Sequence, residues 1–165
     1  MNEAFQNKFE KIYIDRASLG SAVAERFLNL FSGKIEITDG KPQMFARGEL
    51  TADQYSLSKK TLFITPFAGS FFKRCPGAKK GLACCNYFVL NLGQQCDMDC
   101  SYCYLQSFIN TPYMVIYSNI DEAFKELEAM YKDNGGEKVR IGTGEVIDSL
   151  SLDPLTLYST RLIEF

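Results

Sequence analysis

Three cysteines within one short segment constrain this chain more than any other feature. Cys96, Cys100 and Cys103 stand at C-x3-C-x2-C spacing, directly after the apolar run 87–92. A [4Fe–4S] cluster normally takes four cysteine ligands, one for each iron. A loop that supplies three cysteines therefore leaves one iron of such a cluster open to a ligand from outside the loop.

A structural zinc site is the alternative interpretation of this loop. Zinc commonly takes four Cys or His ligands in a closed tetrahedron. The chain has no histidine, so the fourth ligand would have to be Cys75, Cys84 or Cys85. Zinc knuckles usually use C-x2-C pairs, whereas this loop opens with an x3 gap and carries Tyr102 before its last cysteine. The spacing favours the iron–sulfur cluster.

Composition limits the class of protein. At 165 residues and 46% hydrophobic content, the chain has enough apolar mass for one globular domain or slightly more. Residues 1–16 are charged and contain no apolar signal region, and no stretch is long enough to cross a bilayer. We therefore expect a cytoplasmic protein without a membrane partner, in which six cysteines serve metal ligation or stay reduced.

Net charge says little about a nucleic-acid partner. The formal net charge of -2 gives no global attraction to nucleic acid. Basic pairs at 59–60, 73–74 and 79–80 are compatible with a local positive patch. Paired lysines on a protein surface are usually only solvated, so these pairs alone are weak evidence for DNA binding.

The first half of the chain has the pattern of a small βαβ unit. Apolar alternation predicts strands, and apolar residues at helical spacing predict a helix with a glycine at its end. In chain order we expect a strand at 11–15, a helix at 19–31 ended by Gly33, a strand at 34–37, an irregular stretch at 38–58 and a strand at 61–65.

The second half continues with α/β alternation. We divide the chain into an N-terminal α/β domain with its linker at 1–85 and a second unit at 86–165. In chain order we expect a strand at 87–92 that leads into the cysteine loop, a helix at 121–132 capped by Asn119 or Asp121 and ended by Asn134-Gly135-Gly136, a strand at 138–141, and a helix that starts after Asp153-Pro154.

The end of the expected strand 138–141 carries a second chemical motif, Gly142-Thr143-Gly144-Glu145. In a (β/α) barrel, functional groups sit at the carboxyl ends of the strands. Small residues there let a ligand approach the backbone. A tight turn with a surface acid is the alternative. The place of the motif, one βα unit after the cysteine loop, favours contact with a cofactor.

The cysteine loop resembles that of the radical S-adenosylmethionine superfamily. The resemblance implies a (β/α)6 barrel of the TIM-like kind, in which S-adenosylmethionine binds the open iron and is cleaved to a 5′-deoxyadenosyl radical that abstracts hydrogen. Gly142, Thr143, Gly144 and Glu145 resemble the segment that receives the methionyl amino group, which would donate to Glu145. The chain after Cys103 suffices for two βα units, so we expect the front of a longer protein, poorly stable and inactive by itself.

A wider resemblance points to one family. The segments YCYLQ at 102–106, Pro112-Tyr113, Tyr117-Ser118-Asn119, 9–37 and 58–67 together look like the spore photoproduct lyase family. Members repair an ultraviolet-induced thymine dimer in DNA, which implies DNA as a partner and an external one-electron donor such as flavodoxin or ferredoxin.

That resemblance also assigns residue roles. Cys96, Cys100 and Cys103 would bind the cluster, and Tyr102 would lie against S-adenosylmethionine. Tyr104 matches a second family tyrosine, and the two tyrosines together would return a hydrogen atom to the cofactor. Ordinary packing around the cluster is the alternative for both tyrosines.

One departure from the family pattern bears on the substrate. In the family, a cysteine just beyond the second barrel strand returns a hydrogen atom to the product radical, but no cysteine follows Cys103 here. Glu145 occupies or neighbours that position, and the O–H bond of a carboxylic acid is too strong for a good hydrogen-atom donor. Asp148 and Ser149 match less specific positions. A photolyase-like relative that acts on another substrate fits this departure better. By the resemblance, damaged DNA, with thymine-dimer repair as the family's reaction, remains the leading substrate class. An inactive or non-DNA-acting module with zinc or a structural cluster is the alternative.

Cys75, Cys84 and Cys85 form a second cysteine group. They could bind an additional metal, supply the missing hydrogen donor or form a redox-active pair. Free cysteines are also commonly buried as small hydrophobic residues. Adjacent Cys84 and Cys85 would point in opposite directions in an extended chain, which disfavours a shared metal. The geometry favours burial.

Overall fold

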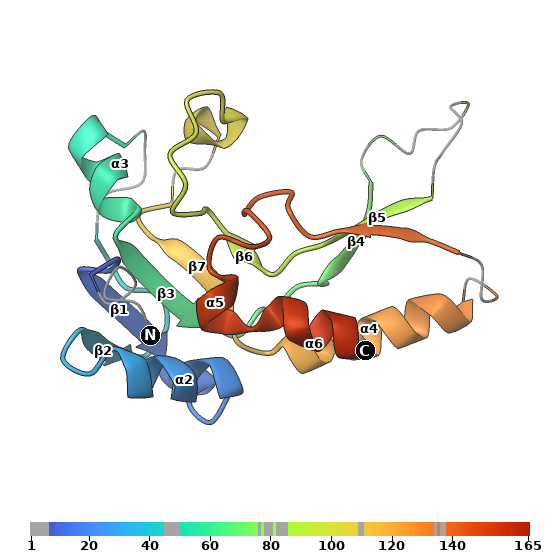
Figure 1. The fold of residues 1–165 in the computed structure, drawn as a ribbon, viewed down its shortest axis with the longest axis horizontal. Coiled ribbons are helices and arrows are strands. Elements are labelled where there is room, and N and C mark those ends of the chain that lie inside the picture. The colour runs from blue at the N-terminus through green and yellow to red at the C-terminus, as the bar shows by residue number, and fades with distance from the viewer. Residues whose placement is uncertain are drawn as a thin grey trace.

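Two β-sheets form the frame of the protein. The structure, a computed structural model, describes residues 7–44, 50–75, 77, 81, 86–108, 111–133, 135 and 138–165. One sheet has the strand order β2-β1-β3-β7-β6, and the other has the order β4-β5-β8 (Figure 1). The parallel strands and the helices between them confirm a mixed α/β fold.

The first sheet is mostly parallel. Strand β1 (Lys11–Asp15) lies between β2 (Ile35–Thr38) and β3 (Thr61–Thr65), and both pairings are parallel. On the far side of β3, β7 (Met114–Tyr117) continues in parallel, and the two-residue β6 (Gly93–Gln94) closes the edge in antiparallel orientation. The predicted strands at 11–15 and 61–65 are confirmed with their bounds, and the strand at 34–37 lies one residue later.

Helix α2 (Ala22–Leu30) connects β1 and β2, as predicted. Ser21 caps it because its Oγ accepts a hydrogen bond from the backbone N–H of Ala24. The helix is shorter than the predicted 19–31. Gly33 follows the helix with φ +92°, a backbone conformation that glycine adopts without strain.

The stretch at 38–58, predicted to be irregular, contains a helix. Helix α3 (Ala52–Ser58) begins after a capping box, in which Thr51 Oγ1 accepts from the N–H of Gln54 and the Gln54 side chain accepts from the N–H of Thr51. Its sequence, ADQYSLS, has too few apolar residues to show helical periodicity. The capping residues Thr51 and Gln54 are the sequence signal that marks this helix.

The second sheet is small. Strand β5 (Tyr87–Leu90) pairs in parallel with β8 (Arg140–Gly142) and in antiparallel with β4 (Phe72–Arg74). The strand predicted at 87–92 therefore ends two residues earlier than expected. The strand predicted at 138–141 begins two residues later than expected. Strands β4, β6 and β7 were not predicted.

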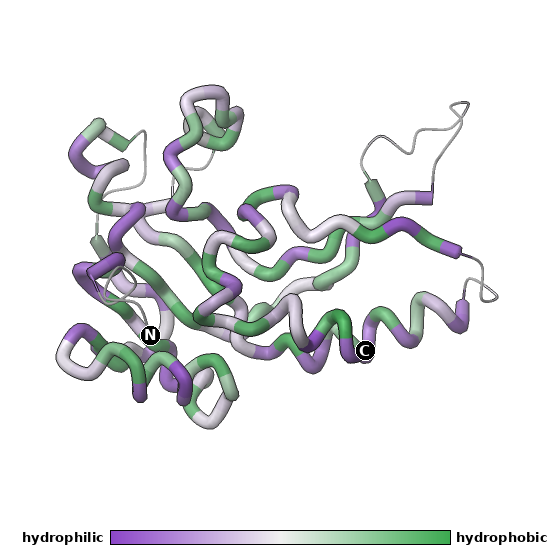
Figure 2. Tube along the Cα trace, in the orientation of Figure 1, coloured by the Kyte–Doolittle hydropathy of each residue, from purple (hydrophilic) through white to green (hydrophobic). Residues whose placement is uncertain are grey.

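The second half of the chain adds three helices. Helix α4 (Ile120–Asp133) confirms the prediction at 121–132, and two short helices, α5 (Asp153–Thr156) and α6 (Tyr158–Glu164), follow the predicted Asp153-Pro154 start. Of the predicted end at 134–136, only Gly135 is described, with φ +64°. Helix α4 shows hydrophilic and hydrophobic colours along its length (Figure 2).

Four of the five α-helices among the described residues lie on one side of the sheets in Figure 1. Helices α2, α4, α5 and α6 lie along the lower side in Figure 1, and α3 lies on the upper side with the loop that follows β6. Arg26 of α2 donates to the carbonyl of Pro154 in α5, at 3.2 Å. The first sheet takes strands from both sides of residue 86, because β7 pairs with β3 and β6 pairs with β7.

The core lies between the first sheet and the helices below it. Phe9, Phe27 and Phe31 are buried against one another, with ring centroids 5.3–6.3 Å apart. At the other end, the buried Tyr158 hydroxyl donates to the carbonyl of Tyr117, and burial raises the pKa of Tyr158. No helix among the described residues combines the length and the apolar character that crossing a bilayer requires.

Candidate cluster and cofactor site

The cysteine loop begins at Gln95, immediately after β6. The backbone N–H of Gln95 donates to the carbonyl of Val146 at 2.8 Å, and its Nε2 donates to Ser58 Oγ at 3.0 Å. Gln95 has φ +62°, so the chain turns sharply there. The start of the loop is therefore held between α3 and the segment that follows Glu145, and the hydrogen bond joins the residue before Cys96 to the residue after Glu145.

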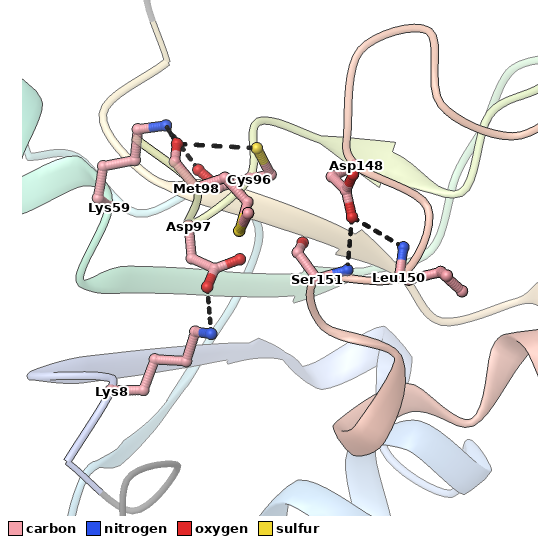
Figure 3. A network of polar contacts seen from close by, with 8 residues as sticks. All are labelled: Lys8, Lys59, Cys96, Asp97, Met98, Asp148, Leu150 and Ser151. Atoms are coloured by element: carbon pink, nitrogen blue, oxygen red, sulfur yellow. Dashed lines mark hydrogen bonds and ion pairs between the residues drawn. The ribbon is translucent and has the colours of Figure 1, made fainter. Parts of the chain in front are cut away.

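Two lysines from the N-terminal part of the chain hold the next three residues. Lys59 Nζ donates to the carbonyl of Cys96 at 2.7 Å and to that of Met98 at 2.8 Å (Figure 3). Lys8 forms an ion pair with Asp97, and their side chains are only 20% and 13% exposed. At that exposure, salt screens the pair less than it screens a surface pair.

The second half of the loop is more open. Cys96 is buried, whereas Cys100 and Cys103 are half-buried and the side chain of Tyr102 is 89% exposed. A hydrogen bond joins the backbone N–H of Cys103 to the carbonyl of Cys100 at 2.9 Å and makes a turn. The loop thus has a buried first cysteine and two cysteines near the surface.

The two tyrosines of the loop have different surroundings. The hydrogen bond of Tyr102 with Cys100, followed by the negative charge of the Cys100 sulfur when it is ionised, raises the pKa of Tyr102. Tyr104 opens the 3-10 helix η2 (Tyr104–Ser107), is 76% exposed and stacks on Phe108 with centroids 5.9 Å apart. Tyr102 therefore lies beside a predicted ligand, and Tyr104 packs against an aromatic ring.

The three thiols have the chemistry that an iron–sulfur cluster requires. The sulfur of Cys96 lies 4.0 Å from the carbonyl oxygen of Met98. Among the described residues, no three Cys, Asp or Glu side chains lie close enough together to hold one metal ion. That finding concerns a single ion, whereas in a [4Fe–4S] cluster each cysteine binds a different iron, so the three thiols need not meet at one point. Three thiols on one short loop are the donors that such clusters use.

The Gly142–Glu145 segment has a tight, packed start and an exposed end. A Cβ atom at Gly142 would lie 1.6 Å from the hydroxyl oxygen of Tyr87, so this glycine leaves room for an aromatic side chain. Thr143 Oγ1 donates to Ser149 Oγ at 2.6 Å. Gly144 and Glu145 are exposed. The segment is therefore partly structural, and Glu145 is accessible to a ligand.

A small cavity lies beneath this segment. Its volume is about 20 Å³, which holds about one water molecule and not an adenosyl group. Asp148 Oδ1 accepts from the N–H groups of Leu150 and Ser151, at 3.0 and 2.7 Å, and makes a turn beside the cysteine loop (Figure 3). Asp148 and Ser149 thus shape the loop that follows Glu145. The cavity is lined by Leu92, Ile116, Thr143, Ile147, Asp148, Ser149, Leu152, Asp153, Thr156 and Tyr158.

Sequence reasoning missed the residues that hold the loop. Lys59 was assigned to a solvated basic pair, yet its ammonium group contacts two loop carbonyls. Lys8 and Ser58 carried no sequence signal for such a role. Of the second cysteine group, Cys75 is half-buried and its sulfur accepts from the N–H of Gly77 at 3.4 Å. Cys84 and Cys85, and the basic pair at 79–80, lie outside the described residues.

Burial predicts an order of thiol reactivity. With limiting iodoacetamide on the metal-free chain, we expect Cys100 and Cys103 to be alkylated several-fold faster than Cys96, because Cys96 is only 8% exposed. Peptide mapping by mass spectrometry at successive times measures the three rates. Equal rates at all three thiols would contradict the described burial of Cys96.

The fold and the loop together define a class: an α/β protein in which a parallel sheet leads into a three-cysteine loop that contacts the end of a neighbouring strand. A family model described as spore photoproduct lyase matches residues 8–165. The chain belongs to the spore photoproduct lyase family.

Solved structures of spore photoproduct lyase share this fold. The structure complexed with dinucleoside spore photoproduct has a TM-score of 0.78 and 22% identity, and the match covers 96% of this chain and 46% of that chain. A mutant with bound AdoMet and dinucleoside spore photoproduct has a TM-score of 0.74 and 23% identity, with 94% and 45% covered. The chain therefore spans less than half the length of these structures. The comparison with curated proteins gave no match.

Proposed function

We propose that this chain binds a [4Fe–4S] cluster through Cys96, Cys100 and Cys103, and S-adenosylmethionine at the remaining iron. The observation that carries the proposal is a hydrogen bond beside the two motifs: the N–H of Gln95, next to Cys96, donates to the carbonyl of Val146, next to Glu145. A cluster on the cysteines and a carboxylate for the methionyl ammonium would then be neighbours. When bound, these cofactors supply one-electron reductive cleavage of S-adenosylmethionine.

The chain's own residues divide the work of binding. Cys96 provides the fixed ligand, because its backbone is held by Lys59. Cys100 and Cys103 provide the two ligands at the surface, and Tyr102 beside them lies against S-adenosylmethionine. Glu145, exposed at the strand end, accepts hydrogen bonds from the methionyl ammonium. Tyr102 and Tyr104 together return a hydrogen atom in this proposal. The exposure of both tyrosines leaves the loop open to an external electron donor, such as flavodoxin or ferredoxin, in the reducing cytoplasm.

We further propose that β5 and β8 are the first two strands of a (β/α)6 barrel. They are parallel neighbours, and α4 lies between them in the chain, as in a βα unit. Both motifs then follow barrel strands, where such barrels place their functional groups. On this proposal, residues 1–85 form the N-terminal domain and residues 86–165 begin the barrel, although β6 and β7 return to the first sheet.

For the substrate, we propose damaged DNA. Family membership and the dinucleoside photoproduct in the related structures support this class of substrate. Lys73 and Arg74 of β4 are exposed and available to phosphates, whereas Lys59 is directed at the cysteine loop. The segment just after β8, where the family has its hydrogen-donating cysteine, contains no cysteine, so in this proposal another group returns the last hydrogen atom to the product.

The proposal is tested by anaerobic reconstitution with iron and sulfide, followed by assay for 5′-deoxyadenosine with dithionite and S-adenosylmethionine. We expect about four irons per wild-type chain, since each cluster holds four. The variant Cys100→Ala should lose the cluster, and the matched control Cys75→Ala should keep it. Any deoxyadenosine that the wild-type chain forms should be lost in Cys100→Ala and kept in Cys75→Ala. Iron-free protein that binds zinc instead would contradict the proposal.

A further inference from the structure

A set of side chains from outside the cysteine loop holds its first four residues. Lys8, Ser58 and Lys59 contact Gln95, Cys96, Asp97 and Met98, and we call Lys8, Ser58 and Lys59 the loop anchor. We propose that Lys59 positions the cysteine loop for the cluster and makes the cluster easier to reduce. This inference rests on the proposed function.

The geometry gives Lys59 control over the backbone at the first ligand. An ammonium group can donate three hydrogen bonds. Two of those from Lys59 go to the carbonyls of Cys96 and Met98, at 2.7 and 2.8 Å, which lie on either side of Asp97. Tying two carbonyls two residues apart to one nitrogen sets the conformation between them. The direction in which Cys96 presents its sulfur is therefore set by Lys59.

Helix α3 gives Lys59 a fixed starting point. Lys59 directly follows α3, and the neighbouring Ser58 is fully buried. Ser58 Oγ donates to the carbonyl of Tyr55 at 2.6 Å and accepts from Gln95 at 3.0 Å. Lys59 Nζ also lies 5.0 Å from the centre of the Tyr55 ring, within the range of a cation–π contact. Through Ser58 and Lys59, the end of α3 therefore fixes where the start of the cysteine loop lies.

The charge of Lys59 acts in the same place. A cluster with three thiolate ligands gains negative charge on reduction, and nearby positive charge favours the reduced form. Asp97 and Asp99 are the acids of the loop and oppose this effect, but Asp97 forms an ion pair with Lys8. The Lys59 ammonium group donates to the carbonyl of Cys96, so its positive charge lies beside the first cluster ligand. Removing it should therefore make reduction harder.

The neighbouring lysine offers a matched control. Lys60 stands next in sequence, but its ammonium group pairs with Glu10 at 2.9 Å, and both side chains are about half exposed. Lys59→Met and Lys60→Met remove the same charge one residue apart and keep most of the aliphatic stem. Lys59→Arg keeps the charge and donors that can reach both carbonyls.

The experiment compares wild-type chain with Lys59→Met, Lys59→Arg and Lys60→Met after anaerobic reconstitution. Potentiometric titration followed by electron paramagnetic resonance gives the midpoint potential, and transfer of iron to a chelator gives the release rate. For Lys59→Met we expect about tenfold faster iron release, and a reduction equilibrium about tenfold less favourable, which is about 59 mV lower for one electron. Lys59→Arg should recover both values, and Lys60→Met should match wild type.

The outcomes separate this inference from the proposed function. A loaded Lys59→Met chain with the wild-type potential and release rate would overturn the role of Lys59 and leave the cluster proposal standing. Equal changes in Lys59→Met and Lys60→Met would also overturn it, because only general charge would then matter. A wild-type chain that takes up no iron would overturn both proposals.

Discussion

Gly93→Ala is expected to lower the free energy of unfolding by about 3 kcal/mol, the upper end of the usual cost of overpacking. A Cβ atom at Gly93 would lie 2.3 Å from the carbonyl oxygen of Val115 and 3.0 Å from Cδ1 of Ile147. The carbonyl cannot move aside easily, because Val115 belongs to β7 and β7 pairs with β3. The new methyl group must therefore push β6 away from the sheet.

The same substitution should disturb the cysteine loop. Gln95 follows β6 directly and holds the loop to Ser58 and Val146. Urea unfolding measures the stability loss, and iron content after reconstitution measures the effect on the loop. Gly40→Ala is the control, since Gly40 has φ +88° and open space around it, and strain there costs only about 1 kcal/mol. Similar losses for both variants would contradict the close approach at Gly93.

Phe27→Ala is expected to cost about 3–5 kcal/mol of stability, the usual range for a buried phenylalanine. Phe27 is fully buried, stacks on Phe31 at a centroid distance of 5.3 Å and contacts Phe9 at 6.3 Å. Loss of its ring leaves a cavity between α2 and the segment before β1. Chemical denaturation followed by circular dichroism measures the change.

A neighbour on the same helix provides the comparison. Leu28 is 37% exposed, so Leu28→Ala should cost well under half as much as Phe27→Ala. Phe9 adjoins Lys8, which pairs with Asp97, so the Phe27 cavity should also loosen that part of the loop anchor. A Phe27→Ala chain as stable as Leu28→Ala would show that α2 is not packed as described.

The sequence predicted the strands that have a clear apolar run bounded by turn residues. The strands at 11–15 and 61–65 are apolar runs between clear turn signals, and their bounds were correct. Strand β6 has only two residues, so it has no periodicity to read. Strand β7 is apolar throughout, but it lies close behind the cysteine loop, where a strand of the first sheet was not expected.

The site divides in the same way. The spacing of the three cysteines is a property of the sequence itself, so it can be recognised without knowledge of the fold. Lys59 and Cys96 are 37 residues apart, and their contact exists only because α3 forms and turns its C-terminal end to the loop. Gly142 was predicted from sequence to let a ligand approach, and this stays a prediction. The contact of Gly142 with Tyr87, which stands opposite the start of β8, could not be read from the sequence. Contacts that depend on tertiary placement were beyond sequence reasoning.

The two sheets are interleaved along the chain, and this has a consequence for synthesis. Strands β4 and β5 belong to the second sheet, β6 and β7 return to the first, and β8 completes the second. Strand β3 can pair with β7 only after residue 117 has left the ribosome. The cysteine loop has already emerged by then. The loop thiols are therefore exposed in the nascent chain before the sheet that supports them is complete. No single cut in the chain would therefore separate the two sheets into fragments that each keep all their strands.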